Sequence, residues 1–361
     1  MKKKVVVGMS GGVDSSVAAY LLKEQGYEVI GVTMLVWQEP DLCQGEQEDS
    51  CCGRSAIEDA RRVAEQLGIP HYVADFQKEF NESVIDYFIR EYQCGRTPNP
   101  CIACNRFIKW ESLLRRGMEF GADWIATGHY ARILRLANGR YTLAKSAAAG
   151  KDQTYVLYSL TQEQLKHTLF PLGDYEKAQV RAIAQQAGLA AAHKPDSQEI
   201  CFVPDHDYAA FISRKTGTAD KPGNFITKDG AVLGRHKGIR HYTIGQRKGL
   251  GIALGRPVFV TKIKPDTAEV VLGEQEELMT TELEAENICY MGAKRLEPGQ
   301  RMRAKIRYSH AGEACEVTHT AEDGNRIGLH FEHPVRAVTP GQAAVFYADD
   351  GFVLAGGTII Q

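Results

Sequence analysis

Short apolar runs alternate with longer amphipathic stretches in the first half of the chain. The runs that are typical of buried strands lie at residues 5–7, 28–35, 71–76 and 123–129. Apolar residues recur at helical spacing between these runs, and we expect helices just after residue 12 and over 55–68, 78–92 and 106–119. This order predicts an α/β fold, a doubly wound parallel sheet whose ligands bind at the carboxyl ends of the strands.

The pattern changes in the second half of the chain. Residues 133–146 predict a hairpin around an Asn-Gly pair, and residues 161–170 and 174–188 predict two helices. From residue 222, short alternating runs with Gly, Pro and Asp turns predict β-rich domains, and an acidic stretch at 273–287 predicts a linker plus a strand. We therefore expect a catalytic domain at 1–205, a small central β-rich domain at 206–275 and a C-terminal β-barrel domain at 276–361.

The composition excludes several classes of protein. The 361 residues are 43% hydrophobic and 24% charged with a net charge of −2, so the chain is long enough for two or three domains and lacks a general basic excess. No run of about 18 apolar residues predicts a membrane span. The apolar run of the opening segment, MKKKVVVGM, is too short for an export signal. The nine cysteines therefore suggest a reducing cytoplasm, in which thiols serve chemistry or metal binding.

Residues 8–16, GMSGGVDSS, lie where the first predicted strand turns into the first helix. The glycines allow a sharp turn and a close approach to a ligand, and the serines supply hydrogen-bond donors. The start of a helix adds free N–H groups and a positive dipole end. This combination predicts a site for a phosphate-bearing ligand. Gly128 and His129 follow the fourth predicted strand and are expected at the same edge of the sheet.

The loop matches neither a Walker A motif, because no lysine follows the glycines, nor a GxGxxG fingerprint. SGGVDSS resembles the PP-loop, SGGxDS, of the ATP pyrophosphatases. That resemblance implies that the loop holds the β- and γ-phosphates of ATP while AMP passes to a substrate oxygen. Asp14 is interpreted either as a ligand that joins Mg²⁺ to the phosphates or as an acidic residue favoured by the helix dipole. Met34 is either an adenine contact or a core residue.

Three cysteines stand in polar, turn-rich segments: Cys101 and Cys104 in TPNPCIACN, and Cys201 in DSQEICFVPD. Cys289 and Cys315 lie instead within expected strands and are interpreted as structural. Paired thiols fit a particular chemistry. A persulfide carries sulfur at the zero oxidation level, so replacing a carbonyl oxygen with sulfide requires two electrons. A second thiolate supplies them by forming a disulfide.

The chain resembles the bacterial tRNA-specific 2-thiouridylases (MnmA/TrmU family) along essentially its full length. The resemblance lies in SGGVDSS, GRTPNPCIACNRFIKW, ATGHYAR, KDQTYVLYSL, PDSQEICFVP and YTIGQRKGLGI. It implies a tRNA-uridine 2-sulfurtransferase that adenylates the 2-oxygen of the wobble uridine (position 34) in tRNA(Lys), tRNA(Glu) and tRNA(Gln) and then thiolates it. It also implies that Cys201 carries a persulfide received from a sulfur-relay donor protein, and that Cys104 is the nucleophile.

The resemblance extends to binding residues. The implied ATP contacts are Gly8, Met9, Ser10, Gly11, Gly12, Val13, Asp14, Ser15, Met34 and Gly128. The implied contacts to the target base are Asn99, Pro100 and Cys101. The implied tRNA contacts are His129, Lys151, Asp152, Gln153, Arg307, Tyr308 and Gln342. Read from charge alone, Lys151 and Arg307 are suited to phosphate, which adds affinity without sequence information.

The chain departs from the family pattern at one position that matters. Many members have Asp where this chain has Cys101, so no carboxylate acts there as an acid or base. A thiol could do so only with a tuned pKa. Alternatively, Cys101, Cys104 and Cys201 could hold three irons of a [4Fe–4S] cluster whose fourth iron delivers hydrosulfide, or contribute to a zinc site. Cys43, Cys51 and Cys52 are interpreted as a further metal site or, preferably, as a cysteine-bearing insertion.

Two basic stretches, residues 234–251 and 301–310, are candidates for holding tRNA. Arg301, Arg303, Lys305 and Arg307 alternate, which would place them on one face of a strand as a ridge that follows phosphates. A charged, solvated outer face of a barrel is the alternative. By resemblance, we expect a small central barrel followed by a six-stranded terminal barrel.

Two other functions compete with thiolation. Another PP-loop ligase, such as an amidotransferase synthetase or an argininosuccinate-type ligase, would not require these three thiols. A non-catalytic RNA-binding or sulfur-carrier protein would keep the basic ridge but would not need the PP-loop. AMP release and sulfur incorporation into tRNA separate the three.

Overall fold

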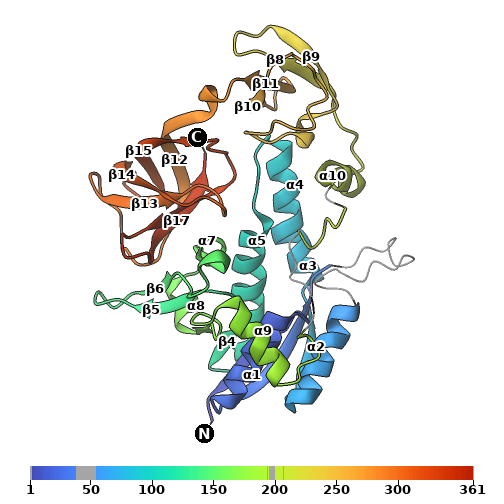
Figure 1. Ribbon diagram of the computed structural model, residues 1–361, viewed down its shortest axis with the longest axis vertical. Helices are drawn as coiled ribbons and strands as arrows, with labels where there is room; N and C mark the ends of the chain where they lie inside the picture. Colours follow the sequence, from blue (N-terminus) through green and yellow to red (C-terminus); the bar gives the residue numbers. More distant parts are fainter. Residues whose placement is uncertain (1, 38–53, 193, 195–199, 206, 361) are drawn as a thin grey trace. The chain divides into compact units, whose positions relative to one another are not determined.

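The computed structural model describes residues 2–37, 54–192, 194, 200–205 and 207–360 (Figure 1). They form two compact units. The first unit comprises residues 1–85, 100–204 and 351–354, and the second comprises 86–99, 205–350 and 355–361. None of the described helices is long and apolar enough to cross a membrane.

A five-stranded parallel sheet is the centre of the first unit. Its strands are β1 (Lys4–Gly8), β2 (Glu28–Leu35), β3 (His71–Asp75), β4 (Trp124–Ala126) and β7 (Thr168–Leu169). Their order is β3-β2-β1-β4-β7, and every pair of neighbours is parallel. The predicted parallel α/β sheet is therefore confirmed.

Alternate residues of β1 pack on opposite sides of this sheet. Val5 and Val7 belong to a core that includes side chains of α1 (Val13–Glu24), α2 (Arg54–Leu67) and α9 (Lys177–Gln186). Val6 points the other way and lies against Gly117 of α6 (Leu114–Glu119). Helices thus cover both faces, which is the doubly wound arrangement.

The stretch at 161–170 was expected to be one helix, and that expectation is wrong. Helix α8 (Gln162–Lys166) is only one turn, opened by a capping box between Thr161 and Gln164. The chain then enters the sheet as β7. An apolar residue every three or four positions over so short a stretch fits a helix as well as an edge strand.

The helix expected at 106–119 begins earlier than predicted. Helix α5 (Pro100–Ala103) leads into η2 (Cys104–Leu113), a π-helical segment, and then into α6. Pro100 is the first residue of α5, a position where its fixed φ favours the start of a helix. Cys101 and Cys104 therefore lie in helical turns and not in the loop that the sequence suggested.

Other elements of the first unit are short. The predicted hairpin is confirmed as β5 (Arg132–Arg135) paired with β6 (Tyr141–Ala144). The expected helix at 78–92 is confirmed as the succession of α3 (Gln77–Phe80), η1 (Asn81–Ile85) and α4 (Asp86–Gln93), the last of which belongs to the second unit. The remaining helical turns are η3 (Ala149–Lys151) and α7 (Thr154–Leu157).

The second unit contains a four-stranded sheet with the order β10-β11-β8-β9. Its strands are β8 (Gly223–Ile226), β9 (Val232–His236), β10 (Phe259–Lys264) and β11 (Glu269–Gly273). The β-rich character that was expected for this part of the chain is confirmed. Helix α10 (Tyr208–Thr216) precedes the sheet and was not foreseen, and η4 (Ile239–His241) follows β9.

The second unit also contains most of a closed six-stranded barrel, as predicted. Its strand order is β12-β15-β14-β13-β16-β17. The bounds are η5 (Glu276–Leu278), β12 (Met279–Tyr290), β13 (Arg301–Lys305), β14 (Glu313–Thr320), β15 (Arg326–Arg336), β16 (Ala343–Tyr347) and β17 (Val353–Ile359). Along β13 the cations alternate with buried residues, so Arg301 and Arg303 are exposed on its outer face. Arg307 lies beyond the end of this strand.

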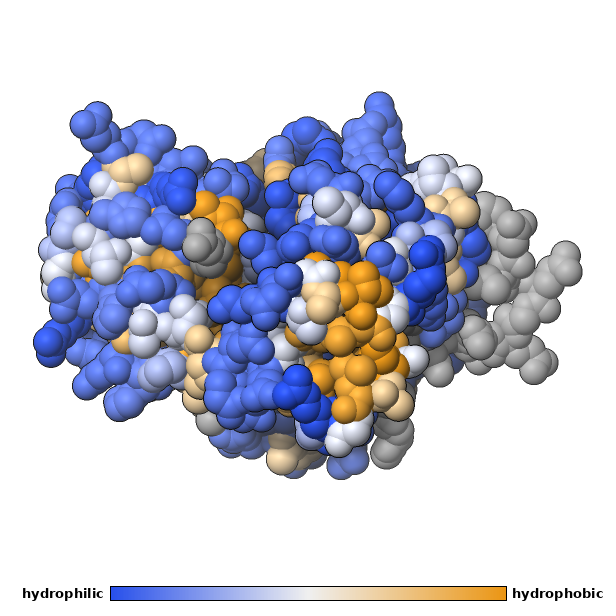
Figure 2. Space-filling model, turned by 90° about the horizontal axis from the view of Figure 1, so that it is seen from above, coloured by the Kyte–Doolittle hydropathy of each residue, from blue (hydrophilic) through white to orange (hydrophobic). Residues whose placement is uncertain are grey.

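The surface is mostly polar in the view of Figure 2, which also shows one larger apolar area among hydrophilic residues. The large apolar side chains with the highest exposure in the described residues include Val232 on β9 and Tyr72 on β3. Single exposed apolar side chains are common on protein surfaces and need no special explanation.

Candidate functional site

The glycine-rich turn connects the end of β1 to the start of α1. Gly11 has a φ of +73°, and Gly12 is the N-cap of the helix. The Ser15 Oγ accepts a hydrogen bond from the Ser10 N–H at 3.1 Å and donates to the Gly12 carbonyl at 3.1 Å. Ser16 Oγ donates to the same carbonyl at 2.8 Å. These hydroxyls close the turn on itself and leave the first-turn N–H groups of α1 for an anion.

Gly128 brings the end of β4 directly against this turn. A Cβ atom on Gly128 would lie 2.6 Å from the carbonyl carbon of Asp14 and 2.7 Å from the Ser15 nitrogen. Only glycine permits this approach without a backbone shift. The prediction that the turn and Gly128 share one edge of the sheet is confirmed.

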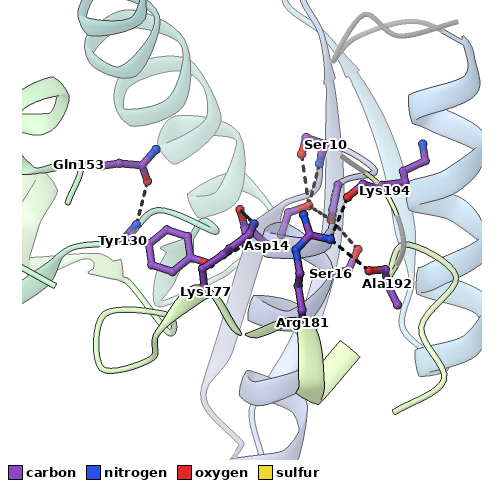
Figure 3. Close-up of polar contacts among 11 residues, drawn as sticks. Ser10, Asp14, Ser16, Tyr130, Gln153, Lys177, Arg181, Ala192 and Lys194 are labelled. Carbon is purple, nitrogen blue, oxygen red and sulfur yellow. Dashed lines mark hydrogen bonds and ion pairs between the residues drawn. The ribbon is translucent and has the colours of Figure 1, made fainter. Parts of the chain in front are cut away.

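The carboxylate of Asp14 is held by two side chains from distant parts of the sequence (Figure 3). Lys177 Nζ, from the first residue of α9, donates to the two carboxylate oxygens at 2.8 and 2.9 Å. The Tyr130 hydroxyl donates to one of them at 2.8 Å. Gln153 fixes Tyr130 in turn, because its Oε1 accepts from the Tyr130 N–H at 2.8 Å and its own N–H donates to the Tyr130 carbonyl at 3.0 Å.

The glycine-rich turn fits a phosphate ligand. Asp14 also fits Mg²⁺, provided that the metal ion competes successfully with Lys177. Asp14 offers the hard oxygen ligands that Mg²⁺ prefers. Those oxygens already accept bonds from Lys177 and Tyr130, so a metal ion at Asp14 has to compete with the Lys177 ammonium. Sequence reasoning missed Lys177, since nothing in a local pattern connects residues 163 positions apart.

The other residues implied for ATP lie along the same edge, with different exposures. Met9 and Val13 are 1% and 3% exposed, so their side chains belong to the core. The Met9 N–H donates to the Val32 carbonyl at 2.8 Å, which ties the turn to β2. Met34 is half-buried near the end of β2.

His129 lies in the interior, beside a half-buried lysine. It is 9% exposed, and burial, together with the charge of Lys109, holds its pKa well below 6.5. The Lys109 ammonium donates to Asn105 Oδ1 at 2.9 Å and lies 3.4 Å from His129 Nε2. The ring packs against Trp110, with centroids 5.5 Å apart. Lys109 and Asn105 are polar residues of this region that sequence reasoning missed.

The candidate thiols lie on neighbouring elements of the first unit. Cys101 is exposed, and Cys104 and Cys201 are partly exposed. The ring of Phe202, next to Cys201, packs edge-on against Phe80 of α3 with centroids 5.7 Å apart. Helices α3 and η1 also pack against η2, which begins at Cys104. The α3–η1 helix therefore lies beside the segment of each thiol.

The described cysteines are not grouped into a site for an iron–sulfur cluster. Within the described ranges, no three His, Cys, Asp or Glu side chains are grouped so that they could hold a metal ion. Cys43, Cys51 and Cys52 lie outside the described residues. Cys315 is buried in β14, and burial raises the pKa of its thiol to about 12, as expected for a structural cysteine.

The residues implied for tRNA have the following positions. Lys151 ends η3, and the next residue, Asp152, accepts a hydrogen bond from Thr154 Oγ1 at 2.8 Å. In the second unit, Arg307 donates to the Arg336 carbonyl at 3.0 Å, and Tyr308 is 44% exposed. Gln342 Nε2 donates to the Thr97 carbonyl at 2.8 Å, two residues before Asn99. Gln342 and the segment around Asn99 are thus brought together.

Three family models match the chain in succession. They are described as the tRNA methyl transferase HUP domain over residues 3–205, the tRNA methyl transferase PRC-barrel domain over 209–274 and the aminomethyltransferase beta-barrel domain over 280–360. A solved structure of an NMN synthetase from Francisella tularensis is 16% identical, covers 61% of this chain and 79% of its own, and has a TM-score of 0.34. That similarity carries no functional argument.

Relatives match over the whole length. The tRNA-specific 2-thiouridylase MnmA of Lachnoclostridium phytofermentans is 60% identical over 99% of this chain and 100% of its own length. The protein of that name from Clostridium kluyveri is 55% identical, with 100% of both chains covered. The chain therefore belongs to the family of tRNA-specific 2-thiouridylases, as its resemblance in sequence predicted.

Proposed function

We propose that this chain is a tRNA-uridine 2-sulfurtransferase that uses ATP to thiolate the wobble uridine of tRNA(Lys), tRNA(Glu) and tRNA(Gln). The observation that carries the proposal is the glycine-lined turn at the edge of the parallel sheet, in the same unit as Cys104 and Cys201. A sulfur-relay protein supplies the persulfide, and the reaction takes place in the cytoplasm. Residues 1–205 form the catalytic domain, and 206–275 and 276–361 contribute to tRNA binding.

The first step is adenylation of the base. The uracil 2-oxygen attacks the α-phosphate of ATP, so that an O–P bond forms, the bond to the β-phosphate breaks and pyrophosphate leaves. The residues that would hold ATP are those of the turn, with Met34 and Gly128. The first-turn N–H groups of α1 favour the phosphates electrostatically. Mg²⁺, held by Asp14, would neutralise charge on the departing pyrophosphate.

The second step replaces oxygen with sulfur. The terminal sulfur of the Cys201 persulfide attacks C2 of the adenylated base, the C2–O bond breaks, and AMP leaves. The Cys104 thiolate then attacks the Cys201 Sγ and releases the thiolated base. The Cys104–Cys201 disulfide that forms accounts for the two electrons that the transferred sulfur gains. A dithiol reductant has to reduce this disulfide before the next turnover.

The remaining site residues support tRNA and base binding. Asn99, Pro100 and Cys101 line the pocket of a flipped-out base. Lys151, Asp152, Gln153, Arg307, Tyr308 and Gln342 contact the tRNA. His129 is buried, so its role is indirect: its neutral ring lies beside the Lys109 ammonium and helps to position it. Iron and sulfide analysis of anaerobically purified protein tests the alternative, in which a [4Fe–4S] cluster delivers the sulfur. Among the described residues, the cysteines are not grouped in a way that could hold such a cluster.

A single assay tests the proposal. The protein is incubated with unmodified tRNA(Lys), ATP–Mg²⁺ and a persulfide donor, and pyrophosphate, AMP and thiolated nucleoside are measured. We expect all three from the wild type. Cys104→Ala and Cys201→Ala should each abolish thiolation, and Asp14→Ala should abolish pyrophosphate release, with tRNA binding within a few-fold of wild type. Cys289→Ala, a half-buried barrel cysteine, is the matched control and should retain activity.

The outcomes separate the competing functions. AMP without sulfur in the tRNA would indicate another PP-loop ligase. Absence of both pyrophosphate and AMP from the wild type would indicate a binding protein. Thiolation by Cys104→Ala would contradict the role given to the second thiol.

A further inference from the structure

The segment that leads to Asn99 begins at a sharply terminated helix. At the end of α4, the Arg96 N–H donates to the Glu91 carbonyl at 2.9 Å, and the Gly95 N–H donates to the Tyr92 carbonyl at 3.1 Å. Gly95 has a φ of +68°. These are the two crossed bonds and the left-handed residue of a Schellman motif. The motif folds the chain back, so that residue 96 lies over residue 91.

An ion pair occupies the place where this motif usually has an apolar contact. Arg96 Nε donates to one carboxylate oxygen of Glu91 at 2.7 Å, and Arg96 Nη2 donates to the other at 2.5 Å. The Glu91 side chain is only 8% exposed, whereas that of Arg96 is 42% exposed. A two-pronged guanidinium–carboxylate contact fixes direction as well as distance. The hydrogen bond to Glu91 raises the pKa of Arg96, so the guanidinium stays charged.

The chain after Arg96 is held from a second side. The Thr97 N–H donates to the Pro340 carbonyl at 2.9 Å, and the Thr97 carbonyl accepts from Gln342 Nε2 at 2.8 Å. A Cβ atom on Gly341 would lie 3.0 Å from both the Arg96 Cβ and the Thr97 nitrogen. The loop at 339–342 therefore packs directly on residues 96–97.

The sequence itself restricts what remains flexible. Thr97 and Asn99 each precede a proline, which disfavours helical backbone at both positions. With residue 96 fixed by Glu91 and residue 97 by the barrel loop, the extended segment has little freedom before α5 begins at Pro100.

We infer that Glu91 is a positioning residue for the target base: through Arg96 it sets the direction of the segment 96–99 and thereby the place of Asn99. This inference rests on the proposed function, in which Asn99 lines the base pocket. The Glu91 side chain is only 8% exposed and is not among the residues proposed to contact tRNA or ATP. Its loss should therefore affect the reaction of tRNA and leave nucleotide binding unchanged.

The test compares Glu91→Gln with wild type in three measurements. We expect kcat/KM for tRNA to fall about 10- to 100-fold, since a displacement of about 1 Å near the reacting groups has effects of this size. The Kd for ATP–Mg²⁺ should stay within twofold. Trypsin cleavage after Arg96 in tRNA-free protein should become faster, because the segment loses its anchor. Glu91→Asp, which keeps the charge, should recover part of the lost kcat/KM.

Glu274→Gln is the matched control. It breaks the exposed ion pair between Arg256 and Glu274 in the same unit and should leave all three measurements unchanged. If Glu91→Gln does not fold, Arg96→Lys tests the same contact, because a lysine cannot make the two-pronged bond.

Two results overturn the inference: a folded Glu91→Gln protein with kcat/KM for tRNA within twofold of wild type, or unchanged cleavage after Arg96. A failure of the proposed function looks different. In that case the wild type itself would thiolate no tRNA, while cleavage after Arg96 in Glu91→Gln would still increase.

Discussion

Gly11 and Gly12 are adjacent residues of the same turn, yet alanine should have different consequences at the two positions. Gly11 has a φ of +73°, where an L-residue is strained. A Cβ atom at Gly11 would also lie 2.5 Å from the Ala56 carbonyl oxygen and 3.1 Å from the Ala56 Cα. At Gly12 the backbone is extended, and the nearest atom, Ser10 Oγ, would be 3.5 Å away.

The expected loss of stability in Gly11→Ala follows from two costs, the strain of left-handed backbone and the steric overlap with Ala56. Left-handed backbone costs an L-residue roughly 1–2 kcal/mol, and forcing a methyl group into a packed contact costs roughly 1–3 kcal/mol. A smaller effect acts in the opposite direction: alanine stabilises the protein by about 0.4–1 kcal/mol, because the unfolded chain has less conformational entropy with alanine than with glycine. We therefore expect Gly11→Ala to lower the free energy of unfolding by about 1–5 kcal/mol. Gly12→Ala should change the stability by no more than about 1 kcal/mol, because the entropic gain opposes the lower preference of alanine for the N-cap position.

Urea unfolding of the three proteins, followed by circular dichroism, measures this difference. The slopes with urea should stay equal if the change lies in the folded state. Pyrophosphate release with tRNA and ATP should also fall in Gly11→Ala at temperatures where it remains folded, because the turn has to move away from α2. Equal stability of Gly11→Ala and Gly12→Ala would refute the reasoning, since only the turn geometry distinguishes them.

Two further predictions use the buried titratable groups. The pKa of His129 is lowered in the folded protein, so its contribution to stability is complete above pH 6.5 and is lost as the pH falls below that value, at up to about 1.4 kcal/mol per pH unit. His129→Gln should reduce this slope in urea unfolding measured between pH 7 and pH 5, and an unchanged slope would contradict the assignment. Burial raises the pKa of Cys315 to about 12, so iodoacetamide at pH 8 should modify exposed Cys94 and leave Cys315 unmodified until the protein unfolds. Peptide mapping by mass spectrometry measures both sites.

Local patterns predicted the sheet and the position of the glycine-rich turn well. Apolar runs identify buried strands directly, and the glycines of residues 8–16 indicate a tight turn, in which Gly11 has a φ of +73°. Helix α2 also ends where expected, because Gly68 follows its last residue with a φ of +59°.

The failures involve signals that local patterns do not contain. Pro100 was interpreted as part of a loop, although a proline is equally suited to the first turn of a helix, and this misplaced the surroundings of Cys104. The contact of Lys177 with Asp14 depends on tertiary packing of α9 beside α1, which no sequence window reveals. The burial of His129 depends on tertiary packing as well, because its neighbours Trp110 and Phe170 come from other segments.

The most direct test of the account is a single turnover with protein that carries a persulfide on Cys201. Unmodified tRNA(Lys) and ATP–Mg²⁺ are added without reductant, the reaction is quenched in acid, and nucleosides, AMP and cysteine-containing peptides are quantified by mass spectrometry. We expect one thiolated uridine, one AMP and one Cys104–Cys201 disulfide per active protein. Thiolated uridine formed while both cysteines remain reduced would contradict this expectation.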